Sequence, residues 1–285
     1  MSATLIDGKA LAARIREGVA ARSAALREQG RPAKLACLLI GEDPASISYA
    51  GSQQKHAEGV GIDYELRVLP GRCDQATALA AVDDLNADTH VSGVIIQMPV
   101  PKGLDGFALQ QRIAAAKDVE GVGAANLGLL AMGRDALAPC TAAAAFACCR
   151  ASGVDITGKE AVVVGRSVIV GKPLAMLLLG ANATVTQCHT RTRDLVAHTR
   201  RAELLFVAAG VPQLIGAEHV SDGAIVIDVG THRVDAGDGK KKTVGDVRFD
   251  EVVGVASQIT PVPGGVGPVT VAMLLENTVA AAERA

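Results

Sequence analysis

The sequence is poor in aromatic residues and has no excess of basic ones. Its 285 residues include four Phe, two Tyr and no Trp. Base-stacking surfaces and aromatic cages depend on several such rings, so both are excluded. Lys and Arg total 28 against 30 Asp and Glu, which gives a formal net charge of −2. Because polyanion-binding surfaces are normally basic, neither nucleic acid nor an anionic membrane is an expected partner.

Long apolar runs and paired metal-ligand or cysteine spacings are also missing. Glycine, proline or polar residues interrupt each apolar run before the roughly 18 residues that a membrane span needs. Charged residues occupy the segment 7–16, where a signal peptide would be apolar. The six Cys show no CxxC motif, and the six His lack paired spacing within one predicted element. We therefore expect a cytoplasmic protein with reduced thiols, no metal site and no membrane segment.

What the sequence does contain is an alternation of short apolar runs with longer helical patterns. In the first half, runs typical of strands occur at 34–41, 64–69 and 91–97, separated by helical patterns at 44–60 and 76–86. In the second half, similar runs occur at 160–165, 183–188, 203–210 and 223–230. This alternation is typical of parallel sheets covered by helices.

The sequence therefore predicts an α/β protein with two lobes. The first lobe comprises residues 1–120, with a C-terminal helix of residues 265–285 returning to it. The second lobe, residues 121–264, is predicted to be a doubly wound, Rossmann-like nucleotide-binding fold. A helix is predicted over 107–117, and the glycine-rich segment 118–133 predicts a break in regular structure between the lobes.

The strand-to-helix turn at 162–173, VVVGRSVIVGKP, is the first candidate site. Gly165 and Gly171 would let backbone N–H groups approach a pyrophosphate at a helix N-terminus. The spacing is not GxGxxG, and an ordinary βα turn explains it equally well. The next strand ends without a carboxylate before Asp194 but brings Arg191 and Arg193, which join Arg166 in favouring a 2′-phosphate. These charges favour NADP over NAD.

Four further regions could contact a ligand. The loop ITPVPGGVGPVT at 259–270 contains three prolines and three glycines, which predict a rigid, sharply turned backbone lining a cleft between the lobes. Gln97 ends a predicted parallel strand, where open α/β sheets bind ligands. Tyr49 and Gln53 share a helix face. For Tyr49, a ring that packs against the protein with its hydroxyl at the surface is the simpler interpretation. Asp118 and Glu120 form a carboxylate pair that a solvated turn would also explain.

Taken together, these segments resemble the methylenetetrahydrofolate dehydrogenase/cyclohydrolase family over essentially the whole chain. The most specific stretches are GRSVIVGKP and TPVPGGVGPVT, accompanied by GVIIQMPVP, KDVEG, NATVTQCHTRT and VGDV. The resemblance implies an NADP-dependent enzyme of one-carbon folate metabolism, a folate cleft between two α/β lobes, and a homodimer built on the cofactor lobe.

The resemblance also implies roles for individual residues. The cofactor would be contacted by Gly165, Arg166, Ser167, Gly171, Thr190, Arg191 and, on the nicotinamide side, Thr231. The folate would be contacted by Tyr49, Gln97, Asp118, Glu120, Pro263, Gly264, Gly265, Val266 and Gly267. The predicted catalytic group is Tyr49, Gln53, Gln97 and Glu120.

Two positions depart from the family pattern. Gln53 stands where the family has a lysine that moves protons in the cyclohydrolase step, and Lys55 lies about 200° around the helix from it. Glu120 replaces the second aspartate of the DVDG segment, and Gly123 stands where bacterial members often have histidine. Dehydrogenation needs no protein base, whereas hydrolysis of the methenyl product gains about 10²–10⁴-fold from a titratable group. We therefore predict that the dehydrogenase activity persists and that the cyclohydrolase activity is weak or lost.

Other functions remain open at this stage. The Glu120 exchange leaves room for a modified folate or another pterin one-carbon carrier as the substrate. A non-catalytic paralogue that binds NADP and folate as a sensor is a second alternative. A shikimate-dehydrogenase-like enzyme is disfavoured because the ITPVPGGVGP loop belongs to the folate pattern.

Overall fold

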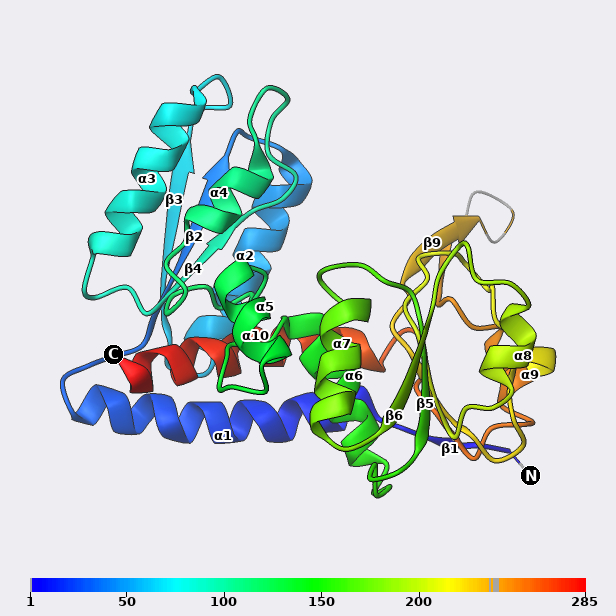
Figure 1. The fold of residues 1–285 in the computed structure, drawn as a ribbon. Helices are drawn as coiled ribbons and strands as arrows, with labels where there is room; N and C mark the ends of the chain where they lie inside the picture. Colours follow the sequence, from blue (N-terminus) through cyan, green and yellow to red (C-terminus); the bar gives the residue numbers. More distant parts are fainter. Residues whose placement is uncertain (1, 236, 238–240) are drawn as a thin grey trace. The chain divides into compact units, whose positions relative to one another are not determined.

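The computed structural model describes residues 2–235, 237 and 241–285. They form two compact units (Figure 1). Unit 1 comprises Met1–Ala13 and Thr141–Thr270, and unit 2 comprises Arg14–Cys140 and Val271–Ala285. The two-lobed α/β fold class is confirmed.

Unit 2 is built on a parallel sheet of β2 (Lys34–Ile40), β3 (Asp63–Leu69) and β4 (Gly93–Ile96), in the order β3-β2-β4. Side chains of β2 alternate between two hydrophobic clusters. Leu35 and Cys37 pack with α1 (Gly8–Glu28), α2 (Pro44–Glu58) and α10 (Val266–Arg284). Ala36 and Leu38 pack with α3 (Gln75–Ala87) and α4 (Gly106–Arg112). Because both faces are covered, the strands are apolar almost throughout.

Aspartates set the starts of three helices in unit 2. The side chains of Asp43, Asp74 and Asp105 accept hydrogen bonds from the backbone N–H groups of Ser46, Thr77 and Ala108, respectively. This capping satisfies donors that the first turn of a helix leaves free. It fixes the start of α2, the helix that bears Tyr49 and Gln53.

The segment between 107 and 133 differs from its prediction. The helix expected over 107–117 ends at Arg112, because Ile113 takes an extended backbone. The predicted break over 118–133 is wrong, since α5 (Ala124–Ala131) forms there. The backbone N–H of Gly123, the N-cap residue of α5, donates to the Asp118 carboxylate. A buried side chain upstream therefore organises a helix start that glycine content alone argued against.

Unit 1 contains a six-stranded parallel sheet in the order β1-β11-β8-β7-β5-β6. Its strands are β1 (Thr4–Leu5), β5 (Glu160–Val164), β6 (Thr184–Cys188), β7 (Leu204–Val207), β8 (Ile225–Asp228) and β11 (Gln258–Ile259). In Figure 1, α6 (Cys140–Ala151) and α7 (Gly171–Gly180) lie on one side of this sheet, and α8 (Leu195–Thr199) and α9 (Phe249–Val252) on the other. This is the predicted Rossmann-like arrangement.

The compact units and the predicted domain limits do not coincide at residues 1–13, 121–140 and 265–270. Residues 1–13 group with unit 1 because β1 pairs with β11. Residues 121–140 group with unit 2, as does the end of α10, where the Asn277 side chain donates to the carbonyls of Val119 and Ala138. The predicted return of the C-terminal helix to the first lobe is thereby confirmed.

The polar segment after β8 forms a short antiparallel hairpin of β9 (His232–Asp235) and β10 (Lys241–Val244). The tip of this hairpin falls mostly outside the described residues. A single 3-10 turn, η1 (Ala217–His219), precedes β8. No helix in the described part of the chain is long and apolar enough to cross a membrane.

Candidate active site

Tyr49 and Gln53 lie on α2, which follows the carboxyl end of β2 in unit 2. The Tyr49 side chain is 51% exposed, whereas Gln53 is buried. Gln97 directly follows β4 and is also buried, with its backbone N–H bonded to the Leu38 carbonyl. The structure thus brings three predicted residues to the carboxyl edge of one parallel sheet, the edge at which such sheets bind ligands.

The Gln53 amide is buried, and the two groups that donate to it are neutral. Its Oε1 accepts long contacts from the Tyr64 hydroxyl at 3.5 Å and from the Cys37 thiol at 4.0 Å. The same thiol lies 3.7 Å from Gln97 Oε1 and so joins the two predicted amides. Burial raises the pKa of Cys37 to about 11, and burial also raises that of Tyr64, so both donors stay neutral at physiological pH. Gln53 is therefore held by neutral groups.

Cys37 and Tyr64 were missed in the sequence. Cys37 lies in the middle of an apolar strand, where a thiol is normally a small hydrophobic residue. The period of two along β2 places it on the same face as Leu35, toward α2. That alternation was the available signal, but only the packing of α2 on this face shows what the thiol contacts.

Glu120 provides the site with a titratable carboxyl group. Its Oε2 is buried, and no described residue donates a hydrogen bond to it. Burial, with a smaller contribution from the nearby Asp118 carboxylate, raises the pKa of Glu120 to about 7. Tyr49 is close enough that the Glu120 carboxylate adds to the burial that raises the phenol pKa. An acceptor without a partner beside Tyr49 is suited to an N–H donor that a ligand would bring.

Glu120 should make the stability of the protein depend on pH. Because its folded-state pKa is about 7, above the 4.5 of an ordinary glutamate, its contribution is complete below pH 4.5 and is lost as the pH rises through 7. Between pH 5 and 8 the unfolding free energy should fall by roughly 2–3 kcal/mol more in the parent than in Glu120→Gln. Urea unfolding at several pH values measures this.

The exposed Glu17, also in unit 2, offers a matched control. Glu17→Gln should retain the full pH dependence of the parent. Equal pH dependence in the parent and in Glu120→Gln would contradict the assignment of this titration to Glu120.

Asp118 has a different environment from Glu120. It is 1% exposed, and its two oxygens accept from the backbone N–H groups of Gly121, Val122 and Gly123 and from the side-chain amide of Asn126. These bonds hold the loop that presents Glu120. The predicted contact of Asp118 with a ligand stays a prediction, whereas its contribution to the loop is direct.

In unit 1, the turn between β5 and α7 has the clearance expected of a phosphate-binding loop. Gly165 has φ +128°, and a Cβ there would lie 2.1 Å from the Ala208 carbonyl oxygen. A Cβ on Gly171 would lie 2.1 Å from the Gly165 carbonyl oxygen. The Ser167 hydroxyl closes the turn by accepting from the backbone N–H groups of Val170 and Gly171.

The backbone N–H groups of this turn fit a dinucleotide phosphate. Across the described ranges, no residue accepts a hydrogen bond from the N–H groups of 166–169. They come just before the N-terminus of α7, where the helix dipole also favours an anion. Together with the glycine clearance, these donors show that the turn fits the pyrophosphate of a dinucleotide cofactor.

The basic residues predicted to contact a 2′-phosphate lie near this turn. β6 neighbours β5, and the Gly165 N–H donates to the Cys188 carbonyl at the end of β6. Arg166, Thr190 and Arg191 are exposed, and neither arginine side chain forms an ion pair within the described residues. The first carboxylate after β6, that of Asp194, caps α8 by accepting from the Ala197 N–H. The segment therefore offers positive charge without a competing acid.

The proline- and glycine-rich loop belongs to unit 1 and packs closely on the start of α1. Gly264 has φ +108°, and a Cβ on Gly8 would lie 1.8 Å from the Gly265 carbonyl oxygen. Val266 is buried, whereas Gly267 faces open space. Pro263 follows a cis peptide bond. The loop thus packs closely on the start of α1, and its rigidity and its contact with folate stay predictions.

Two buried aspartates at the carboxyl edge of the unit 1 sheet were not identified in the sequence. Asp228 ends β8 and accepts from the backbone N–H groups of Gly230, Asp246 and Val247. Burial, opposed by these hydrogen bonds and reinforced by the charge of Asp246, raises the pKa of Asp228 to about 7. Thr231, predicted on the nicotinamide side, is exposed just after this strand end.

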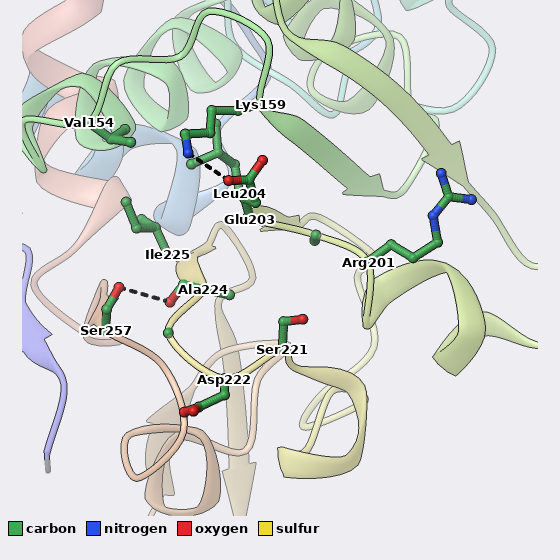
Figure 2. Close-up of a pocket in the computed structure, with 12 residues that line it drawn as sticks. Val154, Lys159, Arg201, Glu203, Leu204, Ser221, Asp222, Ala224, Ile225 and Ser257 are labelled. Carbon is green, nitrogen blue, oxygen red and sulfur yellow. Dashed lines mark hydrogen bonds and ion pairs between the residues drawn. The ribbon is translucent and has the colours of Figure 1, made fainter.

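A separate pocket lies in unit 1 and contains no predicted site residue (Figure 2). It is lined by residues at the starts of strands, including Leu204 of β7 and Ile225 of β8, with Lys159 and Glu203 paired at 2.6 Å. Ligands of open α/β sheets bind beyond the carboxyl ends of the strands. This pocket lies at the opposite, amino ends and is separate from the nucleotide turn.

These features define the class of the protein. Unit 1 is a Rossmann-type dinucleotide-binding unit, and unit 2 presents Tyr49, Gln53, Gln97 and Glu120 at the carboxyl edge of a second parallel sheet. A dinucleotide unit joined to a second α/β unit is the organisation of a two-domain dehydrogenase.

Comparisons with known proteins agree with this class. Residues 6–120 match the catalytic domain, and residues 139–285 the NAD(P)-binding domain, of tetrahydrofolate dehydrogenase/cyclohydrolase. The chain is 50% identical to "Bifunctional protein FolD 1" of Rubrobacter xylanophilus over 280 residues, covering 98% of this chain and 97% of that one. It is 47% identical to "Bifunctional protein FolD" of Moorella thermoacetica over 284 residues, covering all of both chains.

The solved structures give the same result. The FolD methylenetetrahydrofolate dehydrogenase/cyclohydrolase of Campylobacter jejuni superposes with a TM-score of 0.94 at 42% identity, covering 99% of each chain. The enzyme of Trypanosoma brucei, solved with NADP cofactor and an inhibitor, gives a TM-score of 0.90 at 37% identity and covers 100% of this chain and 98% of that one. The chain belongs to the tetrahydrofolate dehydrogenase/cyclohydrolase family.

Proposed function

We propose that this chain catalyses the NADP-dependent oxidation of 5,10-methylenetetrahydrofolate to 5,10-methenyltetrahydrofolate, and that it hydrolyses the methenyl product weakly or not at all. The observation that carries the second part is the buried, neutral amide of Gln53, at the position where the resemblance implies a lysine. Family membership and the dinucleotide turn support the first part.

The oxidation demands little acid–base chemistry from the protein. The C–H bond of the methylene carbon breaks, and its two electrons leave as a hydride. Bound NADP supplies the hydride acceptor. The cation that remains is stabilised by both adjacent nitrogens, so no proton has to move. The residues of this chain therefore need only to bind and orient the folate, a role that fits Tyr49, Gln97 and Glu120, whose Oε2 has no donor among the described residues.

Hydrolysis makes a different demand on the same residues. Water must lose a proton as it attacks the methenyl carbon, and a folate nitrogen must gain one before the ring opens. A titratable side chain next to these atoms typically contributes about 10²–10⁴-fold. An amide cannot exchange a proton in this way, and the two donors to Gln53, Cys37 and Tyr64, have raised pKa values and stay protonated. The titratable carboxyl of the cluster, that of Glu120, is the group that we assign to folate binding.

One preparation of the purified protein can test both parts. We expect NADP reduction that depends on methylenetetrahydrofolate, with hydrolysis of methenyltetrahydrofolate at least about 10²-fold slower than that of a lysine-containing family member assayed in parallel. Hydrolysis at a matching rate would overturn the second part. Faster turnover of methylenetetrahydromethanopterin would favour the other carrier, and NADP binding without any turnover would favour a sensor.

We also propose a cytoplasmic homodimer built on unit 1. The resemblance implies this dimer, and exposed apolar side chains on unit 1 support it, since Val168, Ile169 and Leu179 are 55%, 52% and 58% exposed. The six cysteines are free thiols, as expected for a reducing compartment.

A further inference from the structure

The crevice for the dinucleotide has two sides, and the second side is not part of the glycine turn. β5 has β6 as its neighbour on one side and β7 on the other. The chain passes from β5 through α7 to β6, and then through α8 to β7. The sheet therefore switches direction between β5 and β7, the point at which doubly wound sheets bind nucleotides. Residues 208–210, which follow β7, face the turn directly, because a Cβ on Gly165 would collide with the Ala208 carbonyl oxygen.

The backbone of this second side is held by a buried carboxylate. Oδ2 of Asp246 accepts from the N–H groups of Ala209 at 2.7 Å and Gly210 at 2.9 Å. Asp246 is 0% exposed, whereas Gly210 lies at the surface. A buried charge thus determines where an exposed loop at the crevice is placed.

The other oxygen of Asp246 has a single side-chain partner. Nε2 of His232 lies 2.6 Å from Asp246 Oδ1, and the imidazole is 21% exposed. The hairpin register brings the pair together, since His232 pairs with Val244, two residues before Asp246. The second buried carboxylate in this region, that of Asp228, accepts from the backbone N–H groups of Gly230, Asp246 and Val247.

Among the described residues, His232 is the hydrogen-bond partner that the structure shows for Asp246 Oδ1. Gly230 and Gly245 leave no room between the two carboxylates, because a Cβ on Gly230 would lie 2.3 Å from Asp246 Oδ1. Without His232, Asp246 Oδ1 would be a buried carboxylate oxygen without its hydrogen-bond donor. Leaving such an oxygen buried costs folding free energy. Loss of His232 should therefore move the Asp246 carboxylate and the loop of residues 208–210 that it holds.

We propose that His232 is a positioning residue for the cofactor: it fixes Asp246, which fixes the Ala209 and Gly210 amides at the edge of the dinucleotide crevice. The role rests on the proposed function, because the crevice must hold NADP. His232 need not touch the cofactor, and it acts by keeping the loop in the binding geometry before NADP arrives. Its loss should therefore weaken NADP binding more than folate binding.

Three substitutions separate this role from a general structural one. His232→Phe preserves the ring but removes the donor, and His232→Asn shortens the side chain so that its amide cannot reach Asp246. His232→Gln places an amide N–H near the position of Nε2 and should restore the bond. His219 provides the control. It also lies beside a carboxylate, that of Glu218 at 3.1 Å, but it precedes β8 and so lies toward the amino ends of the strands.

The test measures amide hydrogen exchange of residues 208–213 in the unliganded full-length protein, and NADP affinity by calorimetric titration. We expect His232→Phe and His232→Asn to speed exchange in this segment and to weaken NADP binding about tenfold, with His232→Gln within about threefold of the parent. His219→Phe should change neither quantity.

Unchanged exchange and affinity in the Asn and Phe variants would overturn the proposal, as would an equal loss in all three His232 variants. If His232→Phe does not fold, the contrast between Asn and Gln decides. Failure of the unsubstituted protein to bind NADP would instead overturn the proposed function, and exchange of residues 208–213 would still report whether His232 supports the loop.

Discussion

Gln53→Lys is expected to raise the rate of methenyltetrahydrofolate hydrolysis by about 10²-fold or more. The new ammonium would stand at a buried position beside Cys37 and Tyr64, in the same cluster as the Glu120 carboxyl. Burial lowers the pKa of a lysine toward neutrality, and that lets it exchange protons with water and a folate nitrogen. The oxidation should change by less than tenfold, because it needs no proton transfer. Both rates are measured spectroscopically on one preparation.

Gln54→Lys is the matched control for this substitution. Gln54 is the next residue on α2, but its amide faces away and bonds Glu58 at 2.8 Å. The Gln54→Lys substitution adds the same charge to the same helix without placing that charge among Cys37, Tyr64 and Gln97. Hydrolysis that rises equally in both variants would show a general charge effect. If neither variant gains hydrolysis, the amide at position 53 is not what limits the second activity.

Gly165→Ala is expected to abolish measurable NADP binding and to destabilise unit 1. The substitution would place a methyl group 2.1 Å from the Ala208 carbonyl oxygen, at a backbone φ of +128° that alanine avoids. Left-handed strain and overpacking together should cost roughly 2–5 kcal/mol of unfolding free energy. Because Ala208 begins the second side of the crevice, the displaced backbone is the part that we propose to contact the cofactor. Denaturant unfolding and calorimetric NADP titration measure the two effects.

Gly180→Ala separates these effects from glycine loss in general. Gly180 ends α7, and a Cβ there would meet nothing within 4 Å. This variant should bind NADP like the parent and be equally or slightly more stable, by about 0.5–1 kcal/mol, since alanine favours a helix. Normal NADP affinity in Gly165→Ala would contradict the assignment of the turn to the cofactor.

Much of the fold follows from local patterns. Apolar runs with helices between them predicted β2, β5 and β6 to within about a residue, because a strand buried on both faces has to be apolar almost throughout. The start of α2 was predictable from Pro44 with Asp43 before it. α5 was missed because its start depends on Asp118, whose hydrogen bonds to Gly121 and Gly123 exist only once the loop has folded around it.

The residues of the candidate site likewise fall into those that a local pattern identifies and those that it does not. Residues with special backbone requirements, such as Gly165, could be identified from the sequence, since a glycine between a buried strand and a helix indicates a close approach of backbone. Cys37, Tyr64, Asp246 and His232 could not. Each becomes notable through one partner far along the chain or on another element, and no local pattern encodes such a pairing.

The sequence by itself determined the class of this protein, through the alternating elements, the dinucleotide turn and the positive charge near the end of β6. These depend on residue type and spacing, which are properties of the chain. The tertiary structure alone decided how the groups behave. It buried Gln53 among neutral donors, left Glu120 Oε2 without a hydrogen-bond donor among the described residues, occupied both oxygens of Asp118 and joined His232 to Asp246. The physical reason is that desolvation and hydrogen bonding depend on what surrounds an atom in space, and folding brings those surroundings from distant parts of the chain.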